Sequence, residues 1–150
     1  TKYFVEQSKC SVGIFINRNF DHLKEVLVLI QDEKDDFLIR YAHRILKNDA
    51  SIQLVIHDEN RLLQSTGAFT KSFEELHLHF PNSYKLIRNA RNNYNHFGRY
   101  SLMLVSYPVW NRLTHDNSTK LENIPSTLII NKKPSRFSGH SNPDKGRVED

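Results

Sequence analysis

The sequence has little cysteine, methionine, glycine and proline: one cysteine, one methionine, five glycines and five prolines in 150 residues. A single cysteine, Cys10, excludes an intrachain disulfide and fits a reducing compartment. No stretch of 18 apolar residues and no signal peptide is present, so we expect no direct membrane insertion of this chain. With Thr1 first and the only methionine at Met103, we expect a piece of a longer protein.

A basic stripe interleaved with aromatic residues is also lacking. The net charge is +4 and the isoelectric point is near 9.2, but part of the excess lies in residues 131–150 and the rest is thinly spread. The short mixture of aromatic and basic residues between Arg91 and Tyr100 is interpreted as packing at a joint between a helix and a strand. We therefore predict no nucleic-acid partner.

The best-defined stretch begins with an unbroken apolar run, Val26–Ile30, which is typical of a strand buried on both faces. After a polar turn the spacing becomes helical. Two adjacent rows four residues apart, Phe37-Tyr41-Ile45 and Leu38-Ala42-Leu46, make a face wide enough to cover a sheet. Strand, turn and amphipathic helix predict the first half of a βαβ unit.

Further buried-type runs extend this pattern. Tyr100–Tyr107 is a second apolar strand, and Trp110–Asn123 is a predicted helix after Pro108. The other predicted strands are Ser11–Asn17, Ser51–His57 and Thr127–Ile130. The order predicts an open, doubly wound parallel α/β sheet of the Rossmann-like class, with Val26–Ile30 and Leu102–Val105 as parallel neighbours at its centre.

The middle of the chain is ambiguous. Leu76–Phe80 alternates with period two, which predicts a short edge strand, although a helix continuing from Phe73 fits nearly as well. Tyr84, Ile87 and Tyr94 follow a helical spacing. From Lys132 onward no apolar period remains, so we expect a flexible polar tail.

Two segments resemble a known family. Cys10–Arg18, CSVGIFINR, resembles a signature in the cytoplasmic tail of monovalent cation:proton antiporters. Residues 26–46 resemble the strand, Asp-Asp turn and helix that follow it there, with Asp35-Asp36 on the acidic pair. Leu102–Lys133 is similar to the last strand-helix-strand of a universal stress protein-like domain.

This resemblance implies a universal stress protein-like fold, with residues 1–24 as a leading strand and linker from a preceding repeat, 25–133 as the domain and 134–150 as a polar tail. It implies a regulatory domain of a sodium or potassium/proton antiporter, acting in regulation or assembly. The location would be the cytoplasmic face of the cell membrane, as part of an integral membrane protein. The expected partners are the membrane transport domain of the same chain and a second copy, paired through an edge strand.

The alternative is a universal stress protein-like module that binds a nucleotide or another small molecule. Nucleotide-binding members of that group carry an Asp at the end of the first strand and a glycine-rich loop after the fourth. This sequence has Gln31 at the first position and no glycine between Val105 and Asn123, which argues against ATP bound in the usual manner. A ligand at the strand ends would meet the candidate binding residues Gln31, Asp32, Asp35, Ser106 and Trp110.

Other chemistry is less well supported. The acidic residues between Asp32 and Asp36 are interpreted as helix caps, with a divalent-cation site as the alternative. His77 and His79 would share one side of a strand but have no third metal ligand. Eight histidines leave pH sensing open as an alternative to chance. Cys10 is interpreted as a buried strand residue. Lacking a phosphate-binding loop and a nucleophile-base pair, the sequence predicts no enzyme, no catalytic residues, no metal site and no cofactor.

Overall fold

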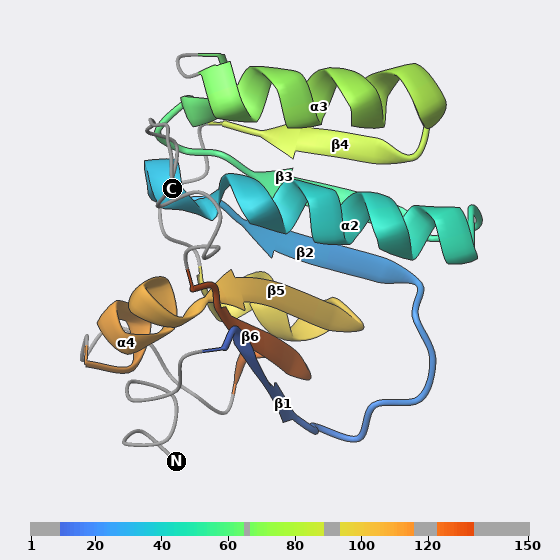
Figure 1. Ribbon diagram of the computed structural model, residues 1–150. Helices are drawn as coiled ribbons and strands as arrows, with labels where there is room; N and C mark the ends of the chain where they lie inside the picture. The colour runs from blue at the N-terminus through green and yellow to red at the C-terminus, as the bar shows by residue number, and fades with distance from the viewer. Residues whose placement is uncertain (1–9, 65–66, 89–93, 116–122, 134–150) are drawn as a thin grey trace.

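A computed structural model describes residues 10–64, 67–88, 94–115 and 123–133, and within them the strands form a single sheet (Figure 1). The strands of this sheet stand in the order β1-β6-β5-β2-β3-β4. They are β1 (Val12–Ile16), β2 (Glu25–Leu29), β3 (Gln53–His57), β4 (Tyr84–Ile87), β5 (Leu102–Ser106) and β6 (Thr127–Asn131). The helices are α2 (Phe37–Asn48), α3 (Gly67–His79) and α4 (Tyr107–His115), with 3₁₀ turns η1 (Glu33–Asp36), η2 (Leu62–Gln64) and η3 (Tyr94–Arg99).

The two strands at the centre, β2 and β5, are parallel neighbours. Val26 lies opposite Leu102 and Val28 opposite Leu104, which confirms the predicted pairing. Every residue from Val26 to Leu29 is 0% exposed, because helices cover both faces of the sheet here. The remaining neighbours are also parallel except β1, which runs antiparallel to β6.

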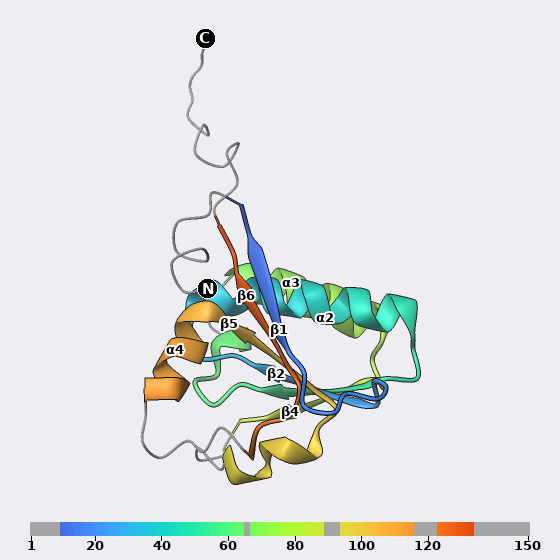
Figure 2. The ribbon, with the colours of Figure 1, turned by 90° about the horizontal axis from the view of Figure 1, so that it is seen from below.

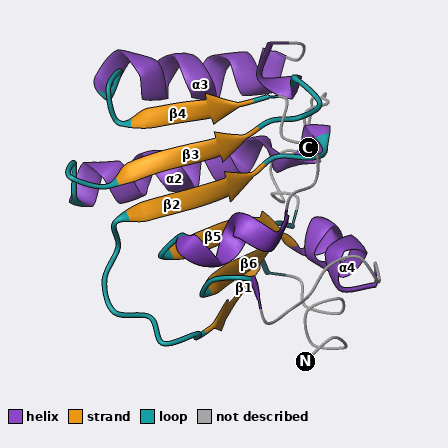
Figure 3. Cartoon of the chain, turned by 180° about the vertical axis from the view of Figure 1, so that it is seen from behind, coloured by secondary structure: helices purple, strands orange, loops and turns teal. Residues whose placement is uncertain are grey.

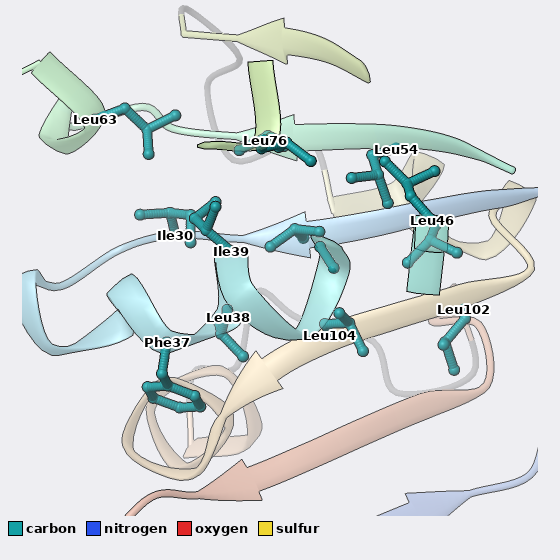
Figure 4. Packing of buried hydrophobic residues seen from close by; sticks show 14 of the residues in the cluster. Ile30, Phe37, Leu38, Ile39, Leu46, Leu54, Leu63, Leu76, Leu102 and Leu104 are labelled. Carbon is teal, nitrogen blue, oxygen red and sulfur yellow. The ribbon is translucent and has the colours of Figure 1, made fainter. Parts of the chain in front are cut away.

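Two apolar clusters lie on the two faces of the sheet. On one face α2 and α3 cover the strands, and Leu38 and Leu46 of α2 lie in one cluster with Leu54 and Leu104 (Figure 4). Ala42 of α2 belongs to the same cluster. On the other face η3 crosses the sheet (Figures 2 and 3), and the second cluster includes Phe97, Tyr100, Val109 and Leu113, together with Leu27 and Met103 of the strands. The predicted packing of Phe97 and Tyr100 is confirmed, since both side chains are buried.

In the middle of the chain, one predicted strand is a helix and one predicted helix is a strand. The predicted strand Leu76–Phe80 is wrong, and the alternative helix is confirmed, because α3 continues to His79. Leu76 is fully buried while Leu78 is 75% exposed, so the alternation of letters is not an alternation of faces. The helix predicted from Tyr84 onward is also wrong there: Tyr84–Ile87 is the edge strand β4, paired with β3.

The fold is therefore α/β with a mostly parallel sheet of six described strands, compatible with a Rossmann-like fold. In the described residues no helix combines the length and apolar character needed to cross a membrane. Cys10 is exposed just ahead of β1, so its assignment to a buried strand is wrong. The expected tail of residues 134–150 and residues 116–122 of the predicted helix Trp110–Asn123 lie outside the described residues. The division into three segments stays a prediction, although β1 belongs to the same sheet as β6.

Candidate functional site

The carboxyl ends of β2 and β5 lie at the point where the chain connections diverge. After β2 the chain passes through α2 to β3 on one side, and after β5 it passes through α4 to β6 on the other. In open α/β sheets such a switch point leaves a crevice in which ligands bind. Gln31 and Asp32 follow β2, and Ser106 ends β5. Because β2 and β5 are parallel neighbours, these predicted residues lie at the same end of the two strands.

The turn after β2 is organised by two carboxylates. Asp35 is 2% exposed, and its Oδ2 accepts the backbone N–H of Gln31 at 3.0 Å and of Asp32 at 2.9 Å. Asp32 Oδ1 in turn accepts the N–H of Lys34 at 3.1 Å. This reciprocal arrangement is a capping box at the start of η1, which runs directly into α2. The interpretation of the acidic residues as caps is therefore confirmed for Asp32 and Asp35, whereas Asp36, at the start of α2, makes no side-chain capping bond.

Asp35 lies in an unfavourable place for a negative charge. Burial raises the pKa of Asp35, and the hydrogen bonds from the backbone of Gln31 and Asp32 offset part of that rise. The Ser106 hydroxyl also favours the charged carboxylate, although it does not reach hydrogen-bond geometry with it. Ser106 is 3% exposed, and its Oγ has no hydrogen-bond partner among the described residues. A buried hydroxyl in that condition is unusual in a folded protein.

A cleft of about 300 Å³ opens beside Asp35 and Ser106. Four of its described lining side chains are basic and two are acidic, and most of its surface is apolar. The other described residues that line it are Lys34, Asp36, Phe37, Arg40, Pro108, Ile130, Asn131, Lys132 and Lys133. The cleft thus joins basic side chains to a buried hydroxyl and a buried carboxyl, which suits a small molecule with an anionic group and a hydrogen-bonding group.

Gln31, Asp32 and Trp110 are not among the described residues that line this cleft. Gln31 instead connects neighbouring elements: its Nε2 lies 3.5 Å from Glu59 Oε1, and its Oε1 lies 3.5 Å from Arg112 Nη2. Trp110 is half-buried and packs against the apolar cluster on the η3 face of the sheet. Of the five predicted binding residues, Asp35 and Ser106 therefore share the cleft.

Sequence reasoning missed the basic side chains of the cleft. Lys132 and Lys133 directly follow β6, and the sequence suggested only the start of a polar tail there. Arg40 is on α2, one turn after Asp36, whose Oδ2 lies 3.9 Å from Arg40 Nη2. The position of the two lysines in the sequence could have predicted this, because residues that directly follow a parallel strand lie at the same end of the sheet as Asp35.

A second buried carboxylate, Asp58, was also missed. It follows β3 directly, is 0% exposed, and accepts the N–H groups of Leu62 at 2.9 Å and Leu63 at 3.1 Å. The sequence could have predicted this residue, since Asp58 is an acidic residue after a buried strand, as Asp32 is after β2. Next to it, His57 is buried with its Nδ1 unpaired among the described residues, and burial lowers the pKa of His57.

The two histidines considered for a shared metal have separate partners. Both lie on α3 rather than on a strand. His77 Nδ1 is 2.6 Å from the Tyr84 hydroxyl, and His79 Nδ1 is 3.0 Å from Nε2 of His43. Across the described ranges, no group of three or more His, Cys, Asp or Glu side chains is placed to hold a metal ion.

Comparison of the chain with models of protein families, with curated proteins and with solved structures gave no match. The function of the chain is therefore inferred from its own residues and their arrangement.

Proposed function

We propose that this chain is a universal stress protein-like regulatory domain of a sodium or potassium/proton antiporter. In this proposal it lies at the cytoplasmic face of the cell membrane and is joined to the membrane transport domain of the same polypeptide. The observation that carries the proposal is the resemblance of Cys10–Arg18 to the antiporter tail signature. Its role is regulation or assembly of the transporter.

The position of β1, which contains most of that signature, supports a role in assembly. β1 lies at one margin of the sheet, and residues Val12–Ile16 carry no charge. At the opposite margin, β4 contains the exposed Lys85. Natural proteins protect free strand edges with charged residues, so an uncharged edge favours a strand that is covered in the complete protein.

Two exposed aromatic side chains, one on β1 and one just after it, also favour a covered β1. Phe15 is 49% exposed and Phe20 is 38% exposed, and their rings meet edge to face at 5.8 Å. Large exposed aromatic residues are typical anchors of protein interfaces. We propose that a preceding repeat of the same chain or a second copy covers β1.

The complete coding sequence tests this proposal most directly. The region upstream of Thr1 should encode about ten or more apolar spans of about 20 residues each. A complete reading frame without them would reject the antiporter assignment. In membrane vesicles containing the complete protein, Phe15→Lys should change the rate or the pH dependence of cation/proton exchange, whereas Lys85→Gln at the opposite margin should leave both unchanged.

A second candidate, a small-molecule or nucleotide-binding module, is favoured by one specific observation. The buried Ser106 hydroxyl, without a partner in the described structure, lines a cleft that also contains basic side chains. A bound molecule would supply the missing hydrogen bond. An anionic group on it would face Lys34, Arg40 and Lys132.

Titration with AMP and ATP, followed by the thermal unfolding midpoint, tests the second candidate. Ligand at 100 times its dissociation constant stabilises the folded state by about 2.7 kcal/mol. Lys132→Gln with Lys133→Gln should reduce the shift in the midpoint, and Lys85→Gln, away from the cleft, should retain it. No shift with either nucleotide at millimolar concentration would exclude nucleotide binding.

A further inference from the structure

The helices α2 and α3 lie side by side on the same face of the sheet (Figure 1). A pair of histidines, His43 of α2 and His79 of α3, joins them. His43 Nε2 and His79 Nδ1 are 3.0 Å apart, with ring centres 5.1 Å apart. His43 is 7% exposed, whereas His79 is exposed to solvent. Phe80 contacts both rings edge to face, so the pair has an apolar neighbour on one side.

This geometry limits how many protons the pair can hold. A neutral imidazole has one N–H donor and one acceptor nitrogen, so a bond between two rings requires one to donate and the other to accept. One additional proton is compatible with the bond, because a charged His79 still donates from Nδ1 to His43 Nε2. With both rings charged, two N–H groups and two positive charges face each other across 3.0 Å.

Taken together, the surroundings of His43 disfavour its charged form. Burial lowers the pKa of His43 most, and the charges of Lys47 on α2 and His79 on α3 lower it further. Glu75, one turn before His79, opposes them. Between α2 and α3, toward the start of α2, a hollow of about 350 Å³ contains further charged groups of this interface. It is lined by Asp36, Arg40, Lys71, Ser72 and Glu75.

The sheet beneath the helices adds no opposing charge. The side chains that pack toward α2 and α3 from β2, β3 and β4 are apolar or aromatic: Val26, Val28, Leu54, Ile56, Tyr84 and Leu86. Tyr84 is titratable, but burial raises its pKa above the ordinary value of 10.0, so it stays neutral across the acidic range. Nothing described on the sheet therefore compensates a second proton on the pair.

We propose that His43 and His79 form a proton-operated latch between α2 and α3, which is closed while at most one ring is charged and opens when both are. Opening loosens α3 from α2, while the central strands β2 and β5 stay folded. The residues on α3 that then gain access to solvent are Phe69 and Leu76, both fully buried in the closed form. The latch does not depend on the function proposed above.

Proton NMR titration of the ring Cε1–H signals, with EDTA present to remove metal ions, tests the coupling between the two rings. In the wild type the coupled rings should titrate in two separate steps, whose midpoints belong to the pair. In His79→Gln, the midpoint of His43 should rise by at least about 0.5 pH unit, because the neighbouring positive charge is gone. His77→Gln, on the same helix, should leave it in place. Equal His43 midpoints in the wild type and His79→Gln would overturn the latch.

Amide hydrogen exchange, corrected for the intrinsic effect of pH, tests the opening itself. When the pH is lowered from 7.5 to 5.5, the opening equilibrium constant of the α3 amides in the wild type should rise at least ~10-fold. That of the β2 and β5 amides should stay unchanged. In His43→Leu and in His79→Gln this increase should disappear. His79 is exposed, so His79→Gln gives a folded variant even where His43→Leu does not. A wild-type α3 that does not respond to pH, or that opens together with β2, would overturn the proposal.

Discussion

Asp35 shows how a single side chain sets the shape of the candidate site. Its carboxylate accepts two backbone N–H groups, from Gln31 and Asp32, which fixes the turn between β2 and α2. The same burial that protects those bonds makes the negative charge costly, and so the pKa of Asp35 is raised. Its acceptor atoms and its charge therefore have opposite effects on stability.

Two substitutions separate these effects. Asp35→Ala leaves two N–H groups without an acceptor and should lower the free energy of unfolding by about 1–3 kcal/mol. Asp35→Asn keeps an acceptor oxygen and removes the buried charge, so at pH 7 its stability should equal or exceed that of the wild type. Urea unfolding of both variants at pH 7 is the measurement. An equal loss in the two variants would show that the charge itself stabilises the turn.

Ser106 gives a third prediction at this scale. Its buried hydroxyl has no hydrogen-bond partner in the described structure, so replacing it with a methyl group removes a desolvated polar atom. Its favourable effect on the Asp35 carboxylate opposes this gain, so without ligand Ser106→Ala should unfold close to the urea midpoint of the wild type. Ser126→Ala is the contrasting variant, because Ser126 Oγ accepts the N–H of Arg18 at 2.8 Å and its loss should destabilise. A destabilised Ser106→Ala would mean that this hydroxyl is hydrogen-bonded in solution.

Among the elements, α3 shows most clearly what a pattern of letters can conceal. Its sequence around Leu76 alternates as a strand does, but Phe69 and Leu76 are buried at a helical spacing. The segment Tyr84–Ile87 shows the reverse, because a strand of four residues is too short to establish its period. Periodicity identified β2, α2 and β5, where long apolar rows face a covered sheet, and it failed at Leu76–Phe80 and at Tyr84–Ile87.

The orientation of α3 predicts different costs for two apolar truncations on the same helix. Phe69 is 0% exposed, and Phe69→Ala should lower the free energy of unfolding by about 3–5 kcal/mol. Leu78 is 75% exposed, and Leu78→Ala should change it by no more than about 0.5 kcal/mol. Urea unfolding measures both. A large cost at Leu78 would mean that this face of α3 is covered in solution.

For the molecule as a whole, the sequence predicted the α/β class of fold and named two of the residues, Asp35 and Ser106, that line the cleft of the candidate site. Both follow from the order of the elements, because two buried strands with diverging connections create a crevice at their ends. The sequence did not reveal that Lys132 and Lys133, about a hundred positions from Asp35, line the same cleft. Such long-range proximity depends on β6 pairing with β5, and no local pattern encodes it.

The stability of the whole domain should fall on mild acidification. The pKa values of His43 and His57 are lowered from 6.5 in the folded protein, so the unfolded chain binds more protons as the pH falls through that value. Asp35 acts in the opposite sense, because burial raises its pKa above the ordinary value of 3.8. The urea midpoint should therefore be lower at pH 5.5 than at pH 7.5, and an unchanged or higher midpoint would contradict this sign.

The capping box at the start of η1 also determines how an anion would be held. Because the Asp32 and Asp35 carboxylates already take the N–H groups of the turn, the protein supplies its own internal counter-ion there. Binding of an anion would therefore depend on the long, solvated side chains of lysine and arginine and not on fixed backbone dipoles. Its affinity should then fade as ionic strength rises, since mobile ions screen such charges over about 8–10 Å at physiological salt.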